Sequence, residues 1–484
     1  RRCSPEFARE IALVLAARGI KVYIFEDLRP TPELSFAVRH LKTIAGVMIT
    51  ASHNPKEYNG CKVYWEDGGQ ISPDLAQKIV EKMRARPDWF VAPMEEGEAR
   101  RRGFLVSVGE EIDAAYLQEV KKGLLNPELI ASKGHDMKFV YTPLHGTGYA
   151  PVRKLLTQIG FTSVYIVPEQ ALPDSEFSTV PVPNPEDAAA FELALKYAAE
   201  GEADLILATD PDADRLGIMA RERDGSYRNF TGNQIGVVLQ YYILSQLKKR
   251  GSLPKDAVVM KSIASTALAE PIAAAFGVDL VNVPVGFKYI AEQIKAMEEK
   301  KSGTFIFGFE ESNGYLAGTY ARDKDAVQAV ALVAEAALYY REEEGKTLGD
   351  VLEEIYRSYG FYLDEQVAMT FEGLEGKSKI KRIMEDLRRE SGTRWGGVPL
   401  TRIEDYLIGR GKRLPDGAEY LLQLPKADVL RFAFDGGGYV MARPSGTEPK
   451  IRIYFCIRGR SQEEAVETLD KVKRDFFAPL YIGQ

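Results

Sequence analysis

The stretch that decides the fold is MITASHNPKEYNGCK, residues 48–62. An apolar run ends at Ile49 and resumes at Val63, and two turn-forming pairs, Asn-Pro and Asn-Gly, lie between them. This pattern predicts a strand, a polar loop and a returning strand. It places the hydroxyl of Ser52 and the ring of His53 at the mouth of a sheet.

Three later segments have the same pattern, an apolar strand followed by a dense polar loop. They are LILATDPDADR at 205–215, TFIFGFEESNG at 304–314 and YVMARPSGTEPK at 439–450. In open α/β sheets, ligands bind where loops leave the carboxyl ends of strands. Four such loops in one chain therefore predict four lobes around one cleft.

Length and charge exclude several classes of protein. A chain of 484 residues is too long for one core, and about 150 residues per domain predicts three or four domains. The formal charge of −7 gives no electrostatic case for binding nucleic acid. The three cysteines lie far apart, no apolar run reaches the roughly 18 residues that span a bilayer, and the amino terminus lacks a signal-peptide pattern. We therefore expect a cytoplasmic protein without a membrane partner.

Alternation of strands and helices predicts an α/β fold. The pattern favours three successive mixed α/β domains of similar topology, built on parallel sheets. After them, short strands joined by turns, together with two helices, predict a smaller α+β lid domain. The predicted segments are 1–113, 114–230, 231–362 and 363–484.

Asp210, Asp212 and Asp214 alternate, so in an extended stretch they would project to one side and could hold one hard cation. An EF-hand is excluded, because Arg215 stands where that loop needs glycine and Arg221 where it needs glutamate. A dehalogenase-type phosphatase also places two such aspartates after a strand, but it expects threonine or valine at the position of Asp214. Mg²⁺ fits best, because it readily shares its coordination shell with phosphate.

The four loops together resemble those of the α-D-phosphohexomutases, which include phosphoglucomutases and phosphomannomutases. The resemblance covers nearly the whole chain, and its motifs occur in the family's order: TASHNP at 50–55, DPDADR at 210–215, GFEES at 308–312 and RPSGT at 443–447. RPTPEL at 29–34 and KVYW at 62–65 look most like the branch that contains phosphoglucomutase and phosphopentomutase. In this family a strand and a glycine- and arginine-containing loop precede the first helix, so we expect this first strand to be missing from the chain.

The resemblance implies roles for residues in and near the serine loop. It makes Ser52 a phosphoserine that also contributes to the metal site. It matches Lys62 to the family's proposed general acid/base, which requires a pKa depressed by the neighbouring dication. Arg215 would balance the charge of the phosphoserine, about −1.5 to −2 at neutral pH, and His53 would donate a hydrogen bond in the loop.

The resemblance also implies where the sugar and its phosphates bind. Glu310 and Ser312 match sugar-hydroxyl contacts, and four further residues are predicted around the substrate: Gly286, Lys288, Arg322 and Lys324. A surface ion pair is an equal alternative for Arg322. The compact anion nest that holds the non-reacting phosphate would consist of Arg443, Ser445, Gly446 and Thr447.

These residues together predict a phosphosugar mutase that interconverts hexose 1-phosphate and hexose 6-phosphate, most consistent with glucose as the hexose. Its cofactors would be Mg²⁺ and glucose 1,6-bisphosphate as primer, and its only predicted partner is a small phosphosugar. Phosphopentomutase and phosphomannomutase remain alternatives, as does a catalytically inactive sugar-phosphate-binding protein. Intact Ser52, Lys62 and aspartates argue against the last, and the sequence does not predict an oligomeric state.

Overall fold

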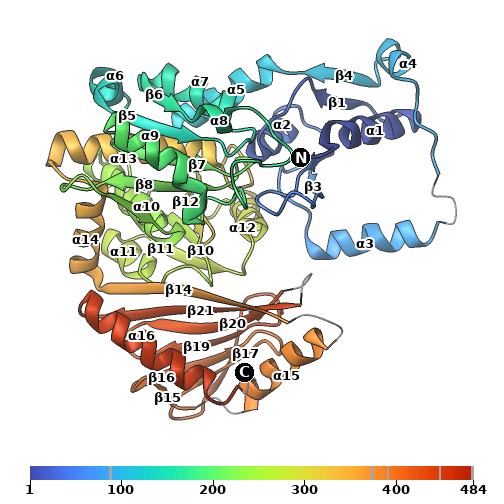
Figure 1. Cartoon of the computed structure of the whole chain (residues 1–484). Coiled ribbons are helices and arrows are strands. Elements are labelled where there is room, and N and C mark those ends of the chain that lie inside the picture. The colour runs from blue at the N-terminus through green and yellow to red at the C-terminus, as the bar shows by residue number, and fades with distance from the viewer. Residues whose placement is uncertain (87–89, 372–374, 390–391, 446–448, 481–484) are drawn as a thin grey trace. The chain divides into compact units, whose positions relative to one another are not determined.

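The computed structural model describes residues 1–86, 90–371, 375–389, 392–445 and 449–480 (Figure 1). The chain divides into two compact units. The first unit comprises Arg1–Lys261 and Gly286–Val351, and the second comprises Ser262–Val285 and Leu352–Gln484. All predicted site residues except those of the 443–447 stretch lie in the first unit.

The serine loop joins two antiparallel strands in the amino-terminal part of the first unit. Met48 pairs with Lys62 and Ile49 with Cys61 across these strands, and β1 runs parallel to β4. The predicted strand, loop and strand are thus confirmed. The elements are α1 (Ser4–Ala17), β1 (Val22–Phe25), α2 (Thr31–His40), β2 (Ala45–Ile49), β3 (Cys61–Trp65), α3 (Pro73–Arg84), α4 (Glu96–Arg101) and β4 (Leu105–Val108).

The next part contains a five-stranded sheet in the order β6-β5-β7-β8-β9. Strands β5, β6 and β7 are parallel, but β8 and β9 are antiparallel to their neighbours, so the prediction of a purely parallel sheet is wrong here. The tight aspartate turn returns the chain directly alongside β7, and only an antiparallel pair permits so short a connection. The elements are α5 (Glu110–Lys122), α6 (Pro127–Lys133), η1 (Gly134–Asp136), β5 (Lys138–Thr142), α7 (Tyr149–Ile159), β6 (Ser163–Ile166), α8 (Pro168–Ala171), η2 (Ala188–Phe191), α9 (Glu192–Gly201), β7 (Leu205–Thr209), β8 (Leu216–Arg221) and β9 (Tyr227–Phe230).

The last part of the first unit is built around a buried helix. Every residue of α13 from Ala326 to Tyr340 is buried, as expected of a helix that is apolar on all sides. Asp325 caps this helix, because its carboxylate accepts the backbone N–H of Gln328 at 2.9 Å. Strand β12 is parallel to β10 and antiparallel to β13. The elements are α10 (Gly232–Lys249), β10 (Ala257–Ser262), α12 (Phe287–Lys300), β12 (Thr304–Glu310), β13 (Gly314–Ala317) and α13 (Ala326–Glu344). Helix α14 (Leu348–Tyr359) begins in the first unit and continues into the second.

The second unit contains an antiparallel sheet with the path β14-β21-β20-β19-β16-β17-β18, and β15 pairs with β16. Side chains of this sheet pack with α15 and α16 in one core, which includes Trp395, Phe432 and Phe476. The α+β arrangement predicted for the carboxyl-terminal part is confirmed, with α15 and α16 as its two helices. The elements are α11 (Ala269–Phe276), β11 (Asp279–Val283), β14 (Phe361–Thr370), α15 (Gly376–Arg389), β15 (Arg394–Trp395), β16 (Val398–Asp405), β17 (Arg410–Arg413), β18 (Glu419–Leu421), β19 (Leu430–Phe434), β20 (Gly438–Pro444), β21 (Lys450–Gly459) and α16 (Gln462–Phe477).

None of the helices in the described ranges combines the length and the apolar character needed to cross a membrane. All three cysteines are free thiols, of which Cys3 and Cys61 are exposed and Cys456 is buried.

Candidate active site

The serine loop holds Ser52 in a strained conformation. Its φ of 48° lies in the left-handed region, which costs a non-glycine residue roughly 1–3 kcal/mol. Its backbone N–H donates to Oγ1 of Thr50 at 2.9 Å, and its own hydroxyl donates to Oδ2 of Asp210 at 2.6 Å. The side chain is 9% exposed. The strained turn therefore directs one serine hydroxyl at the first predicted metal ligand.

Arg1 holds the same loop from its outer side. Its guanidinium lies 4.7 Å from the ring centroid of Phe177. It donates hydrogen bonds to the backbone carbonyl oxygens of Ser52, Asn54, Pro55 and Tyr58. Sequence reasoning missed this residue, because an arginine 51 positions before the serine carries no local signal.

The three aspartates converge at the carboxyl end of β7. Asp210, Asp212 and Asp214 are 0%, 3% and 1% exposed, and one oxygen of each lies within 4.8 Å of the others. The turn is closed by Oδ1 of Asp210, which accepts the backbone N–H groups of Asp214 at 3.0 Å and of Arg215 at 3.1 Å. Ala213 adopts a φ of 51° to make this turn.

The donor set fits a hard divalent cation. The Oδ1 atoms of Asp212 and Asp214 are buried and have no hydrogen-bond partner among the described residues. An unpaired buried carboxylate oxygen is costly, and a cation with oxygen ligands would satisfy both. Burial raises the pKa of Asp210 well above its usual range, and the charges of Asp212 and Asp214 raise it further. A dication would oppose this rise and keep all three groups ionised.

Two threonine hydroxyls orient the central carboxylate. Oδ2 of Asp212 accepts hydrogen bonds from Oγ1 of Thr31 at 3.0 Å and from Oγ1 of Thr50 at 3.2 Å. Thr31 begins α2 and is fully buried. Both contacts join segments more than 150 residues apart, so single-sequence patterns could not reveal them. These hydrogen bonds fix Oδ2 of Asp212 and leave its Oδ1 without a hydrogen-bond partner among the described residues.

Two lysines neutralise the aspartate cluster. Nζ of Lys62 lies 2.8 Å from Asp212 and 2.9 Å from Asp214, and Nζ of Lys324 lies 3.2 Å from Asp214. Burial alone would lower the pKa of Lys62, but the two carboxylates raise it well above its ordinary value. The depressed pKa expected from the sequence depends on a neighbouring dication and stays a prediction. Lys62 in this arrangement is an ammonium group.

Glycine at position 314 makes room for Lys324. A Cβ atom at this position would lie 2.1 Å from Cδ of Lys324, so only glycine allows the lysine stem to lie against β13. The carboxylate of Asp323 lies beneath the same ammonium at 3.7 Å. It also accepts the hydroxyl of Tyr64 at 2.6 Å and the amide of Gln70 at 2.8 Å. The sequence analysis missed Asp323, although it directly precedes a predicted residue.

His53 and Arg215 flank the serine and the aspartates. Nδ1 of His53 lies 3.2 Å from Oγ of Ser52. Burial, with the nearby Arg215 charge, lowers the pKa of His53 to about 3, so the ring is neutral at physiological pH. Arg215 forms an ion pair with Glu186 and lies 3.9 Å from Asp214. A neutral ring beside the hydroxyl agrees with a hydrogen-bonding role for His53.

On the predicted sugar side, the structure brings Gly286 and Glu310 together. The backbone N–H of Gly286 donates to Oε1 of Glu310 at 2.8 Å, and Gly286 has a φ of 123° that favours glycine. Burial raises the pKa of Glu310 to about 7. Ser312 lies half-buried in the turn that follows β12, and Nζ of Lys288 lies 5.2 Å from the ring centroid of Tyr289.

In the structure, the side chain of Arg322 contacts protein groups that were not predicted for it. It is 1% exposed, forms an ion pair with Glu298 at 2.5 Å, and donates to the backbone carbonyl oxygens of Thr319 and Ala321. Its guanidinium thus ties its own loop to α12. The structure favours the alternative that the sequence left open, an ion pair, although this one is buried.

In the second unit, cations gather where β20 ends and β21 begins. Arg443 lies directly opposite Arg452 in the strand register, and the backbone N–H of Ser445 donates to the carbonyl oxygen of Lys450 at 2.7 Å. Like charges opposite each other destabilise a strand pair, so this end of the sheet favours an anion. Gly446 and Thr447 of the predicted nest lie outside the described residues.

Four domain models of one family match this chain. They are the three alpha/beta/alpha domains and the C-terminal domain of phosphoglucomutase/phosphomannomutase, at residues 1–88, 114–225, 231–359 and 403–474. The chain belongs to the phosphoglucomutase/phosphomannomutase family. Its fold is therefore three α/β domains and a C-terminal domain, and it is an enzyme of the phosphohexomutase class. The boundaries predicted at 113, 230 and 362 stay predictions.

Individual relatives support the same assignment. The phosphoglucomutase of Staphylococcus epidermidis is 41% identical over 461 residues, covering 94% of this chain and 81% of that protein. The phosphoglucomutase of Staphylococcus aureus is 38% identical over 479 residues, covering 97% and 83%. Among solved structures, the open form of Paramecium parafusin, a phosphoglucomutase, has a TM-score of 0.74 at 18% identity, covering 100% of this chain and 86% of that one. At this identity the structural likeness supports the fold alone.

Proposed function

We propose that this phosphohexomutase interconverts glucose 1-phosphate and glucose 6-phosphate, with Ser52 as the phosphoryl carrier. The observation that carries the proposal is the 2.6 Å hydrogen bond from Oγ of Ser52 to Asp210, inside a cluster of three buried carboxylates. The relatives named phosphoglucomutase at 38–41% identity support glucose as the hexose.

In the proposed first step, phosphoserine 52 gives its phosphoryl group to the free hydroxyl of the sugar phosphate. The bond between Oγ of Ser52 and phosphorus breaks while the sugar oxygen bonds to phosphorus, and the hydroxyl proton ends on Oγ. The product is glucose 1,6-bisphosphate. In the second step the bond between the other phosphorus and its sugar oxygen breaks, this phosphorus bonds to Oγ of Ser52, and the serine proton ends on the sugar oxygen. The same bisphosphate can therefore serve as the primer that first phosphorylates the enzyme.

Charge around Ser52 supports this chemistry. Asp210, Asp212 and Asp214 would hold Mg²⁺, which withdraws electron density from a phosphoryl group and makes its phosphorus easier to attack. Lys62 and Lys324 add two ammonium groups that can donate hydrogen bonds to phosphoryl oxygens. Because their Nζ atoms lie within 3.2 Å of the clustered carboxylates, we propose both lysines as electrostatic stabilisers, and Lys62 as the general acid/base.

Substrate contacts complete the proposal. Glu310 ends β12 and Ser312 lies in the turn that follows, and we propose that they present a carboxyl and a hydroxyl to sugar hydroxyls. Gly286 orients Glu310 through its backbone N–H. We propose Arg443 and Ser445 for the phosphate that is not transferred, on the strength of the paired arginines at that sheet end.

A coupled assay tests the function directly. The protein is assayed with Mg²⁺ and a bisphosphate primer against the 1-phosphates of glucose, mannose and ribose. We expect kcat/KM to be highest for glucose 1-phosphate. Preference for the ribose or mannose compound would assign the chain to phosphopentomutase or phosphomannomutase, and binding without turnover of any of the three would support the inactive binding protein.

A further inference from the structure

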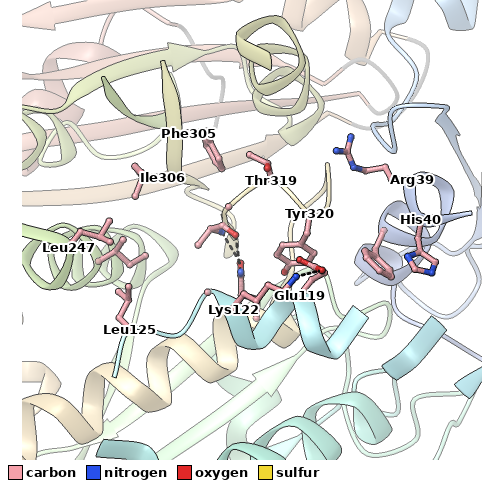
Figure 2. A pocket seen from close by; sticks show the side chains of 16 residues that line it. Arg39, His40, Glu119, Lys122, Leu125, Leu247, Phe305, Ile306, Thr319 and Tyr320 are labelled. Atoms are coloured by element: carbon pink, nitrogen blue, oxygen red, sulfur yellow. Dashed lines mark hydrogen bonds and ion pairs between the residues drawn. The ribbon is translucent and has the colours of Figure 1, made fainter. Parts of the chain in front are cut away.

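A pocket of about 590 Å³ in the first unit is lined by none of the residues predicted for catalysis. Its walls come from α2, the end of α5, α10, β12 and the segment between β13 and α13. This volume lies in the range of small-molecule sites, roughly 300–1,000 Å³. Figure 2 shows its side chains around a common open space.

The pocket is apolar at one end and cationic at the other. Figure 2 shows Leu125, Leu247 and Ile306 gathered on one side, and Arg39 and His40 on the opposite side. Tyr320 lies between the two groups, as do Lys122 and Glu119, whose side chains form an ion pair at 2.6 Å. A ligand that fills this space must be apolar at one end and must face positive charge at the other.

Arg39 gives the cationic end its net charge. Its guanidinium donates to the backbone carbonyl oxygen of Asp67 at 2.9 Å, and among the residues that the structure describes no carboxylate forms an ion pair with it. Burial lowers the pKa of Arg39 and the neighbouring Arg322 lowers it further, while the charges of Glu298 and Asp67 act in the opposite direction. Arg322 already has Glu298 as its partner. A half-buried arginine in this position therefore favours an anion with a phosphate, sulfonate or carboxylate group.

We propose that this pocket is a second ligand site, which binds a small organic anion with a short apolar body and is distinct from the candidate active site. The anionic group contacts Arg39, with His40 and Lys122 nearby, and the apolar body lies against Leu247, Phe305 and Ile306.

One continuous segment, residues 318–324, links this pocket to the aspartate cluster. Gly318, Thr319 and Tyr320 line the pocket, and Lys324 at the other end of the segment contacts Asp214 at 3.2 Å. Between them, the backbone N–H of Arg322 donates to Oγ of Ser35 on α2, the helix that also carries Arg39. A ligand that draws Arg39 and Tyr320 together therefore acts on the segment that positions Lys324. Occupancy of the pocket changes turnover.

Binding is tested with phenylphosphonate, which joins an anionic group to an apolar ring and carries no transferable phosphoryl ester. Methylphosphonate carries the anionic group without the ring, and benzyl alcohol carries the ring without the anionic group. Titration calorimetry of the whole protein should give one phenylphosphonate site per chain and weaker binding of both halves. Arg39→Gln should weaken phenylphosphonate binding about tenfold to a hundredfold, which is the usual effect of losing one charge-assisted hydrogen bond. The exposed Lys122→Gln should weaken it less.

Arg18→Gln is the matched control, because Arg18 is exposed at the end of α1 and lines no part of the pocket. Equal affinity in wild type and Arg39→Gln would overturn the proposal. So would loss of binding in Lys324→Gln with retention in Arg39→Gln, because phenylphosphonate would then occupy the candidate active site. These measurements need no turnover, so they are independent of the proposed mutase activity.

The link to turnover has its own test. Saturating phenylphosphonate should change kcat or KM about fivefold or more in wild type and leave Arg39→Gln unaffected at the same concentration. Binding linkage is reciprocal. If phenylphosphonate changes the affinity for the sugar phosphate by some factor, bound sugar phosphate should change the affinity for phenylphosphonate by the same factor. Binding to the pocket without any change in kinetics would overturn the link.

Discussion

The Oγ atom of Ser52 donates a 2.6 Å hydrogen bond to Oδ2 of Asp210, although 158 residues separate them in the chain. Each follows a strand, Ser52 after β2 and Asp210 after β7. A phosphoryl group on this oxygen would stand beside three carboxylates and two ammonium groups. The hydrogen bond thus places the proposed phosphoryl carrier at the mouth of the proposed metal site.

Ser52→Ala should lower mutase turnover by about 10³-fold or more, because it removes the proposed nucleophile. Substrate binding should remain. Intact-mass spectrometry after treatment with glucose 1,6-bisphosphate should find phosphate on the wild type and on the control Ser132→Ala, and none on Ser52→Ala. Phosphate mapped to another residue of the wild type would end the role of Ser52.

Asp212→Asn should raise the Mg²⁺ concentration needed for half-maximal activity by roughly 10–100-fold or more, because an amide oxygen is a weaker ligand than a carboxylate. Exhaustive chelation should abolish activity in the wild type. The control is Asp470→Asn, an exposed position on α16. Full activity of chelated wild-type protein, with metal removal verified by elemental analysis, would contradict the metal role of the cluster.

The sequence predicted those parts of the site that depend on residues close together in the chain, and missed those that depend on distant segments. The turn around Ser52 and the alternating aspartates are encoded within a few residues, and the structure forms both turns at the predicted places. The contacts of Thr31, Arg1 and Asp323 depend on segments far apart in the chain, and no pattern near those residues indicates their partners. Arg322 shows the converse, since the family resemblance predicted a substrate contact, with a surface ion pair as an equal alternative, and its guanidinium pairs with Glu298 on α12. The sequence likewise predicted alternation of strands and helices, but not that the aspartate turn makes β8 antiparallel.

Glu33 makes folding stability depend on pH. Burial, together with the adjacent Asp113 carboxyl, raises the pKa of Glu33 to about 9, while Asp113 itself pairs with Arg29. The folded state holds the proton of this carboxyl more tightly than the unfolded state does. Its contribution to the free energy of unfolding is therefore fully present at pH values below the pKa of the unfolded state, near 4.5. This stabilisation is lost as the pH rises toward about 9, with a slope of about 1.4 kcal/mol per pH unit.

Glu33→Gln should therefore flatten the fall in the free energy of unfolding between pH 6 and 8.5 and should be more stable than the wild type at pH 8. Urea unfolding at several pH values measures this difference. The exposed Glu110→Gln on the neighbouring helix α5 serves as the control. Parallel pH profiles for wild type and Glu33→Gln would show that Glu33 does not ionise in this range.

Tyr64→Phe should destabilise the fold by about 1–3 kcal/mol, because it leaves the buried Asp323 carboxylate short of one hydrogen bond. Tyr64 lies two residues after Lys62 on β3, and Asp323 directly precedes Lys324. The hydroxyl thus joins the two segments that carry the ammonium groups, and kcat should fall along with stability. Urea unfolding and the coupled assay test both effects against Tyr165→Phe, an exposed tyrosine on β6. Loss of stability with unchanged kcat would make this contact purely structural.

Gly314→Ala should lower catalytic activity while leaving the stability of the fold nearly unchanged. The backbone of Gly314 does not require glycine, because its φ is outside the left-handed region, but a new methyl group would overlap Cδ of Lys324 at 2.1 Å. The flexible lysine stem can move away at little cost to the fold, and its ammonium then loses its place beside Asp214. We expect kcat to fall about tenfold, with the melting temperature within a few degrees of wild type. Gly201→Ala is the matched control, since a Cβ atom there meets nothing within 4 Å. If Gly314→Ala kept full activity, Lys324 would not need its position against β13, and the proposal that its charge stabilises the transferring phosphoryl group would lose its structural basis.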